Sequence, residues 1–336
     1  KIVGRRPLDI DRPAERRAQP QQGAAIRLRV SRAPQLHPLG LASGQAGQVE
    51  SARIQGGADL AEFARLHQQR ERPARAEEHL HLAERNHDEL HALQEHRPPD
   101  LSPSEITTFL EGLPQRYLRV FTPEAIYRNV RLARDIHPDE VHTWMERAGS
   151  IWSLSVAPLD KPFLFSNICG VLSSFGMNIL RGHAFTNPNG LVIDAFEFTD
   201  DERYLELNAD GEGRVLQVLQ DVVAGKADVA VLLRGREQSI LHARSTARIQ
   251  PVVRADGAAS GHYTILDIVA GNALGLLHRI SRVISQQGCD VGLVLIATEG
   301  ERAIDVFHIT KAGAKLTDAE QGALTADLQH ALEGTV

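Results

Sequence analysis

The stretch Leu154-Ser-Val-Ala-Pro-Leu-Asp160-Lys-Pro162-Phe-Leu-Phe-Ser-Asn-Ile168 recurs in altered form 112 positions later, as Leu266-Asp-Ile-Val-Ala-Gly-Asn272-Ala-Leu274-Gly-Leu-Leu-His-Arg-Ile280. The same offset relates Gly176 to Gly288 and Thr186 to Thr298. It falls to 111 between Asp194 and Asp305, so the second copy lacks one residue in a hairpin turn. A repeat of this size predicts two similar small domains rather than a solenoid of short units.

Each copy has the pattern of strand, helix, strand, strand, helix, strand. In the first copy, the expected elements are Ile151–Ala157, Pro162–Phe175, Asn178–Thr186, Leu191–Thr199, Gly213–Val223 and Ala227–Leu233. In the second they are His262–Val269, Leu276–Gln287, Asp290–Thr298, Arg302–Thr310 and Asp318–Glu333, with no clear final strand. This order predicts an α+β fold of two ferredoxin-like βαββαβ domains, each an antiparallel four-stranded sheet with two helices on one face. Pairing the two units, edge to edge or face to face, would cover their exposed edges or faces.

The chain before the repeats divides into two regions. Residues 1–100 contain Phe63 as their only aromatic residue, so we expect them to be largely disordered to about residue 58 and loosely helical beyond it. Ser102-Pro103-Ser104-Glu105 is a helix start, and residues 101–149 are expected to form a helical linker module. The predicted domains are then 150–234 and 262–336. The linker between them, 235–261, contains one extra strand at Ile249–Val253.

Composition excludes several classes of protein. A net charge of −6 and a pI near 6.2 argue against nucleic-acid binding. No apolar run is long enough for a membrane span, and no signal peptide is evident. Cys169 and Cys289 lie in apolar segments without metal-ligand spacing, as expected for a protein of the reducing cytoplasm. The histidines around His87-Asp88 are interpreted as a solvated helix face rather than a metal site. Because the chain starts at Lys1 rather than methionine, we expect it to be a fragment of a longer protein.

The motifs of each copy identify a family. The order of a strand, Asp160-x-Pro162-x-Leu164, a helix, Gly176-x-Asn178-Ile179 and Asp194-x-Phe196 resembles the ACT domain, a small-molecule-sensing module. The tandem pair, with its flanking segments, resembles the C-terminal end of the bacterial protein-PII uridylyltransferases over about residues 105–333. The lead-in Phe109-Leu110-x-x-Leu113-Pro114-x-Arg116-Tyr117 and the hairpin around Gly300-Glu301-Arg302 are similar to those of that family.

The resemblance implies a regulatory region that senses glutamine in nitrogen regulation. It also implies nucleotidyltransferase and HD phosphohydrolase domains, which this sequence lacks. The protein PII would be engaged through those missing domains, and Mg²⁺ is expected only there. We find no catalytic motif, so the chain itself is assigned no catalytic residue, metal or cofactor, and whether it is an enzyme stays open. The alternative is a free-standing tandem ACT module that binds a ligand or dimerises without enzyme activity.

The resemblance places the ligand at the loop between the first strand and first helix of each copy. The candidate ligand-binding residues are Asp160, Lys161, Pro162, Phe163 and Leu164, and their counterparts Asn272, Ala273, Leu274, Gly275 and Leu276. A helix N-terminus there would favour a ligand carboxylate, and an acid could pair with its ammonium group. Each loop departs from the family pattern Asp-Arg-Pro-Gly-Leu, so both loops could instead serve only to cap helices. Asp194 and Asp305 are expected on a solvated strand face.

Overall fold

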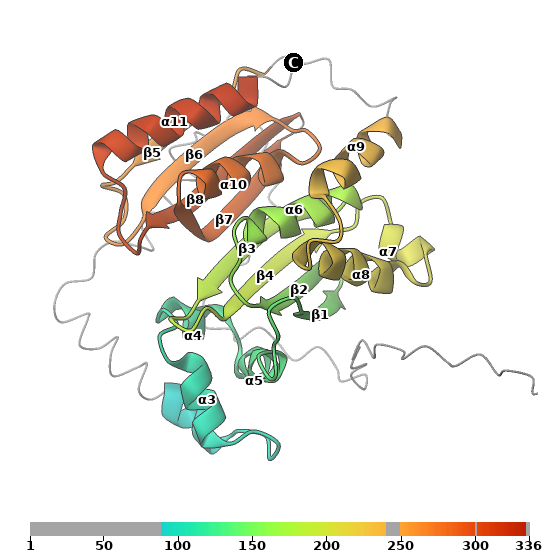
Figure 1. Cartoon of the computed structure of the whole chain (residues 1–336), viewed down its shortest axis with the longest axis vertical. Coiled ribbons are helices and arrows are strands. Elements are labelled where there is room, and N and C mark those ends of the chain that lie inside the picture. The colour runs from blue at the N-terminus through green and yellow to red at the C-terminus, as the bar shows by residue number, and fades with distance from the viewer. Residues whose placement is uncertain (1–88, 240–248, 300, 334–336) are drawn as a thin grey trace, which may run out of the picture. The chain divides into compact units, whose positions relative to one another are not determined.

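A computed structural model describes residues 89–239, 249–299 and 301–333 of the chain. The expectations for disorder and loose helix in residues 1–88, and for the histidines up to His87, lie outside these ranges. Element numbers follow Figure 1.

The first described elements form the helical module that the sequence predicts. Its helices are α3 (Pro103–Leu110), α4 (Arg116–Val120) and α5 (Pro123–Leu132). The predicted start of α3 is confirmed: the Ser102 hydroxyl accepts a hydrogen bond from the Glu105 N–H, and the Glu105 carboxylate accepts one from the Ser102 N–H. At α5, the Thr122 hydroxyl accepts a hydrogen bond from the Ala125 N–H at 3.4 Å.

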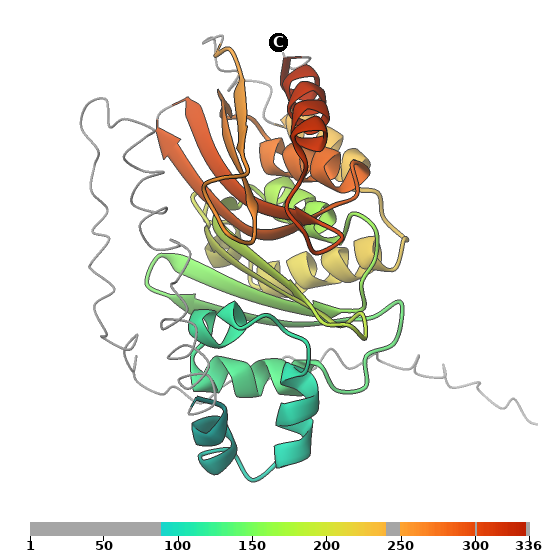
Figure 2. The ribbon, with the colours of Figure 1, turned by 90° about the vertical axis from the view of Figure 1, so that its left-hand side faces the viewer.

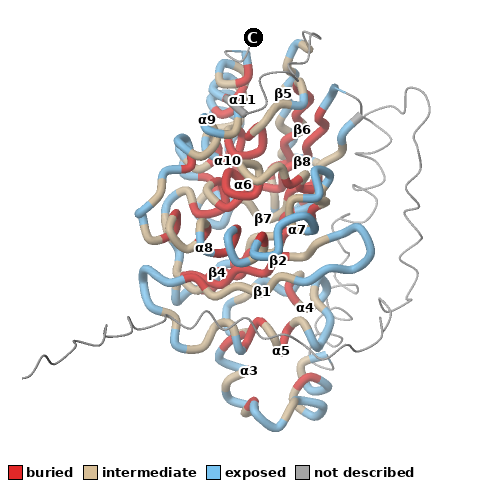
Figure 3. Tube along the Cα trace, turned by 90° about the vertical axis from the view of Figure 1, so that its right-hand side faces the viewer, coloured by how far each residue is buried: buried red, intermediate tan, exposed pale blue. Residues whose placement is uncertain are grey.

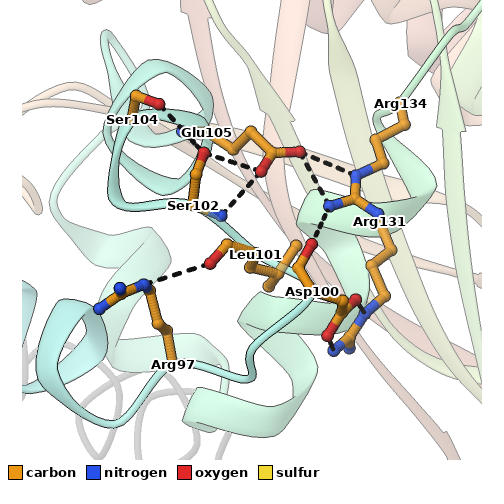
Figure 4. Close-up of polar contacts among 8 residues, drawn as sticks. All are labelled: Arg97, Asp100, Leu101, Ser102, Ser104, Glu105, Arg131 and Arg134. Carbon is orange, nitrogen blue, oxygen red and sulfur yellow. Dashed lines mark hydrogen bonds and ion pairs between the residues drawn. The ribbon is translucent and has the colours of Figure 1, made fainter.

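A charged network ties the start of α3 to α5 and the segment after it (Figure 4). The Arg131 guanidinium donates two hydrogen bonds to the Asp100 carboxylate, at 2.7 and 2.8 Å, and lowers the pKa of Asp100 to about 2. Arg134 donates to Glu105 at 2.9 Å and to the Asp100 carbonyl at 2.6 Å. These contacts fix the module's helices against one another.

The two copies of the repeat share one antiparallel sheet of eight strands. The strands of the first copy are β1 (Val141–Ala148), β2 (Ile151–Pro158), β3 (Asn178–Thr186) and β4 (Val192–Thr199). Those of the second are β5 (Val252–Asp256), β6 (Thr264–Gly271), β7 (Cys289–Glu299) and β8 (Arg302–Lys311). Their order across the sheet is β1-β2-β4-β3-β7-β8-β6-β5. The antiparallel sheet and its edge-to-edge continuation from one copy to the next therefore agree with the sequence-based expectations.

The edge strands correct the predicted order of elements. Each copy is strand, strand, helix, strand, strand, helix, because β1 and β5 precede the strands that they pair with. β1 lies at the end of the module expected to be entirely helical. β5 lies three residues beyond the predicted start of the linker strand.

The closing strand predicted at Ala227–Leu233 is wrong, since Val229–Ser239 is the helix α9. Asp228 starts this helix by accepting a hydrogen bond from the Ala230 N–H at 2.7 Å. β1 already occupies the edge of β2 where the predicted strand would have paired.

The helices of both copies cover one face of the sheet, as the two views in Figures 1 and 2 show. These are α6 (Leu164–Ser174), α8 (Gly211–Val223), α10 (Leu276–Gln286) and α11 (Asp318–Glu333). The first copy also contains the short α7 (Tyr204–Leu207) before α8 and α9 after it. One continuous apolar core lies between them and the sheet, and Figure 3 shows buried residues in α6, α10 and the strands β4, β6 and β8. On the opposite face, the helical module packs against Ala157, Phe185 and Ile193 of the first copy.

The two copies meet along a local twofold relationship. β3 pairs with β7 through three residue pairs, and the central pair, Gly182 and Val294, joins positions 112 apart, which are counterparts in the repeat. On the helix side, His278 lies against Ser166, its own counterpart, with Nδ1 2.7 Å from the Ser166 carbonyl oxygen. Because a carbonyl only accepts, His278 Nδ1 donates this bond. Burial is the main reason that the pKa of His278 is lowered, which favours the neutral ring.

Arg116 of α4 attaches the helical module to this junction. Its Nη2 donates a hydrogen bond to the Ala184 carbonyl at 2.7 Å. Its guanidinium lies 4.2 Å from the centre of the Phe185 ring and 5.7 Å from that of Tyr263, which belong to the first and second copies. A side chain at Gly292 would meet both Tyr263 and Arg116, at 2.9 and 3.2 Å. The module therefore contacts both copies through one side chain.

Candidate functional site

The first predicted loop joins β2 to α6 and is held against the β3–β4 hairpin. The Asp160 N–H donates to the Gly190 carbonyl at 2.8 Å, and Leu159 forms a bridge with Leu191. Lys161 Nζ lies 2.9 Å from Asp139 Oδ1 and 3.0 Å from the Val223 carbonyl. The Lys161 side chain therefore already ties the loop to the end of α8.

The second loop has the same backbone hydrogen bonds as the first. The Asn272 N–H donates to the Glu301 carbonyl at 2.7 Å, which matches the bond from Asp160 to Gly190 in the other copy. The Leu276 N–H donates to the Ala273 carbonyl at 3.1 Å, as Leu164 does to Lys161 at 3.2 Å. The two loops therefore differ in side chains rather than in backbone structure.

Only part of each predicted set lies where a ligand could reach it. Asp160, Pro162 and Asn272 are exposed, and Lys161, Phe163, Ala273 and Leu274 are partly buried. Leu164 and Leu276 belong to the apolar core beneath the helices, and Gly275 is buried as well. The leucines thus anchor the helix starts, and the exposed polar residues are those that can contact a ligand.

Phe163 and Gly275 precede α6 and α10 in the same left-handed conformation, with φ of 65° and 69°. A glycine adopts this conformation without steric cost, whereas another residue pays about 1 kcal/mol or more. The Phe163 ring offsets part of this cost by lying 5.2 Å from the guanidinium of Arg282, on α10 of the other copy. A Cβ atom at Gly275 would approach Leu233 Cδ1 to 3.1 Å.

Gly275→Ala is therefore expected to lower the free energy of unfolding by about 1–2 kcal/mol. Phe163→Gly is expected to change it by less than about 1 kcal/mol, because relief of backbone strain offsets the lost ring contact. Denaturant unfolding of both variants measures the difference. Gly213→Ala, an exposed helical position with nothing within 4 Å of the new Cβ, is the control and should not be destabilised. Equal losses from Gly275→Ala and Phe163→Gly would contradict the assignment of strain.

Asp194 and Asp305 correct another expectation, because both are buried on the helix-covered face of the sheet. They are 1% and 2% exposed. Among the described residues, neither carboxylate oxygen of Asp194 has a hydrogen-bond partner. The same is true of Oδ1 of Asp305. Burial raises the pKa of Asp305 to about 7, and burial together with the nearby Asp160 carboxylate raises that of Asp194. The alternation along each strand carried this signal, since Asp194 and Asp305 share a face with the buried Phe196 and Phe307.

Asp290 and Asn178 are candidate site residues that sequence reasoning missed. β3 and β7 run antiparallel, with His183 opposite Leu293, so the start of β7 lies at the end of β3. This places Asp290 at the same end of the sheet as the first loop. The pKa of Asp290 is raised, mainly by burial and to a lesser extent by the Asp160 carboxylate. By the same register, the start of β3 lies at the end of β7, where the Glu301 carbonyl holds the second loop.

The two ends of the β3–β7 pair therefore hold matched sets of polar residues. We call Asp160, Asp194 and Asp290 the acidic junction. Their counterparts in the repeat, Asn272, Asp305 and Asn178, form the asparagine junction. Each junction combines a loop and one strand of one copy, β4 or β8, with the first residues of the strand by which the other copy joins it, β7 or β3. A ligand at either junction would contact both copies.

Other kinds of site find no support in the described part of the chain. No three histidine, cysteine or acidic side chains of residues 89–239, 249–299 and 301–333 are arranged to hold a metal ion. None of the helices in those ranges is long and apolar enough to cross a membrane. Cys169 and Cys289 are buried free thiols, as their apolar sequence context predicts.

Comparison with known proteins gives one consistent group of relatives. The protein of Bradyrhizobium diazoefficiens is 27% identical over 230 residues, which cover 66% of this chain and 24% of the relative. The proteins of Gluconobacter oxydans and Caulobacter vibrioides are 28% and 29% identical, over 65% and 67% of this chain, and again over 24% of each relative. All three are bifunctional uridylyltransferase/uridylyl-removing enzymes. The chain thus spans about a quarter of the length of the curated relatives that it matches.

No family model matches the sequence. Among solved structures, a protein of unknown function from Galdieria sulphuraria aligns over 55% of this chain and 93% of its own, with 9% identity and a TM-score of 0.19, which is too low to bear on the fold. The sequence relatives instead confirm the resemblance to the uridylyltransferases. The chain is homologous to a C-terminal fragment of the bifunctional uridylyltransferase/uridylyl-removing enzymes.

Proposed function

We propose that this chain is the amino-acid-sensing regulatory region of a bifunctional uridylyltransferase/uridylyl-removing enzyme, with glutamine as its ligand. The two copies are ACT domains in which the fourth strand of the sheet comes from the N-terminal side of each copy. In this proposal the region acts in nitrogen regulation in the cytoplasm. Homology to the enzymes and the repeated loop between strand and helix are the two supports.

The observation that carries the proposal is the position of the two loops at the two ends of the β3–β7 pair, which we call the seam between the copies. Each loop precedes an eleven-residue helix, α6 or α10, whose N-terminal N–H groups favour a carboxylate. The strand that leads into each loop pairs with a buried aspartate, Asp194 or Asp305, that has an unpaired oxygen, which favours a cationic group. A free amino acid offers both charges a few ångströms apart.

Binding at the seam would regulate by changing how the two copies are held together. The strand pairing between them spans only three residue pairs, and Arg116 connects that place to the helical module. A ligand shifts such an equilibrium only by as much as it binds one arrangement better than another. In the proposed enzyme the module would pass this change to the catalytic portion.

The catalytic activities, Mg²⁺ and the protein PII belong, in this proposal, to the three quarters of the relatives' length that the chain does not match. The chain would contribute no catalytic residue of its own. A free-standing tandem ligand-binding or dimerisation module is the alternative. It is favoured if the coding sequence upstream of Lys1 lacks the Asp-x-Asp motif of a nucleotidyltransferase.

Calorimetric titration of the full 336-residue chain with L-glutamine tests the proposal. We expect saturable heat with L-glutamine and much weaker heat with L-glutamate, L-leucine and L-phenylalanine. Far-UV circular dichroism of the same sample establishes that the chain is folded. A folded chain that gives no heat with any of the four amino acids would refute amino-acid sensing and leave a module that only packs.

A further inference from the structure

The acidic and asparagine junctions have the same backbone but different charge. The acidic junction has three carboxyl groups, whereas the asparagine junction has one, Asp305, because Asn272 and Asn178 stand where Asp160 and Asp290 stand. The matched hydrogen bonds from Asp160 to Gly190 and from Asn272 to Glu301 show that this contrast does not come from different folding of the loops.

In the acidic junction, the Asp160 carboxylate acts on each of the other two carboxyl groups. The Asp160 charge adds to burial in raising the pKa of both Asp194 and Asp290, whereas burial alone raises that of Asp305. Asp194 is 1% exposed, and neither of its oxygens has a hydrogen-bond partner among the described residues. Like charges held together disfavour ionisation, and a cation placed between them removes that cost. The acidic junction is thus built to receive positive charge.

The residues around the acidic junction indicate which chemical group carries that positive charge. The described residues are not arranged as metal ligands, and the N-terminus of α6 next to Asp160 favours a negative group. A small zwitterion satisfies both requirements. We propose that the acidic junction alone binds the amino acid, one molecule per chain, by its α-ammonium group, and that the asparagine junction binds none. This inference rests on the proposed function and assigns it to one of two equivalent places.

The ligand arm of the test compares L-glutamine with glutaramate, the same molecule without its α-amino group, in calorimetric titrations of the full chain. We expect one L-glutamine per chain and at least tenfold weaker binding of glutaramate, because a hydrogen bond between charged groups contributes more than a neutral one. Two L-glutamine molecules per chain, or equal affinity for glutaramate, would overturn the inference.

The protein arm uses substitutions at equivalent positions. Asp160→Asn and Asp290→Asn, neither of them in the apolar core, are expected to weaken L-glutamine binding at least tenfold, and Asn272→Ala is expected to bind as the wild type does. Asp201→Asn, an exposed aspartate just after the end of β4 and outside the acidic junction, controls for net charge. Binding that is insensitive to Asp160→Asn but lost in Asn272→Ala would refute the inference and leave amino-acid sensing intact. Absence of binding to the wild-type chain would refute the proposed function itself.

Discussion

Asp305→Asn is expected to make the protein progressively more stable than the wild type as the pH rises from 4 to 8. The folded-state pKa of Asp305 is about 7, against an ordinary value of 3.8. A carboxyl group with a raised pKa stabilises the folded state below pH 3.8, and this contribution is lost as the pH rises to 7. At 1.36 kcal/mol for each unit of pKa, the upper limit of the effect is on the order of 4 kcal/mol. The neutral asparagine does not titrate.

Urea unfolding of the variant and the wild type at each half unit of pH measures this effect. The quantity of interest is the difference between their free energies of unfolding, because groups that titrate in both proteins cancel in it. Asp201→Asn is the control, since a carboxylate on the surface keeps its hydration on folding. A difference that stays constant between pH 4 and pH 8 would show that Asp305 is hydrated or paired in solution.

Tyr117→Ala is expected to lower the free energy of unfolding by about 3–5 kcal/mol. The Tyr117 ring is fully buried, and its centre lies 4.8 Å from that of Phe121 and 5.1 Å from that of Phe185. Its hydroxyl accepts a hydrogen bond from Asn129 Nδ2 at 2.8 Å. The substitution leaves a cavity between the helical module and β3, and it leaves the buried Asn129 without this partner.

Tyr117→Phe separates the two contributions, because it keeps the ring and removes only the hydroxyl. Its expected cost is about 1–3 kcal/mol, the penalty for an unsatisfied buried amide. Denaturant unfolding followed by tryptophan fluorescence reports on β1 and β2 through Trp144 and Trp152. If Tyr117→Ala costs no more than Leu207→Ala, an exposed control, the helical module is not part of the folded core.

Features with local causes could be predicted from the sequence, whereas those set by distant pairing could not. The cap at Ser102 and the two strands on either side of Gly190 depend on neighbouring residues, and both were predicted. Whether Ala227–Leu233 becomes a strand depends on whether the edge of β2 is vacant, and β1, which ends 79 positions earlier in the sequence, fills that edge. Short apolar runs of this kind fit either structure until the pairing is known.

The candidate site shows the same division. The loop residues could be located from the repeat, because a strand, a polar turn and a helix are encoded locally. The burial of Asp194 follows from the alternation of residues along its strand. The prediction of a solvated position instead followed the general preference of charged side chains for water. Asp290 joins the site only through the register of β3 with β7, which nothing in the neighbourhood of Asp290 reveals.

The pairing of Gly182 with its own counterpart Val294 has a consequence for how many copies such a protein can contain. When the same edge of two equivalent units meets itself, the contact is isologous, and forming it uses that edge in both partners. A head-to-tail contact would leave one edge available and could extend through further duplications. Here the outer edges, β1 and β5, are of a different kind from the joined ones, so a third unit cannot attach by the same contact. This particular contact is complete with two copies.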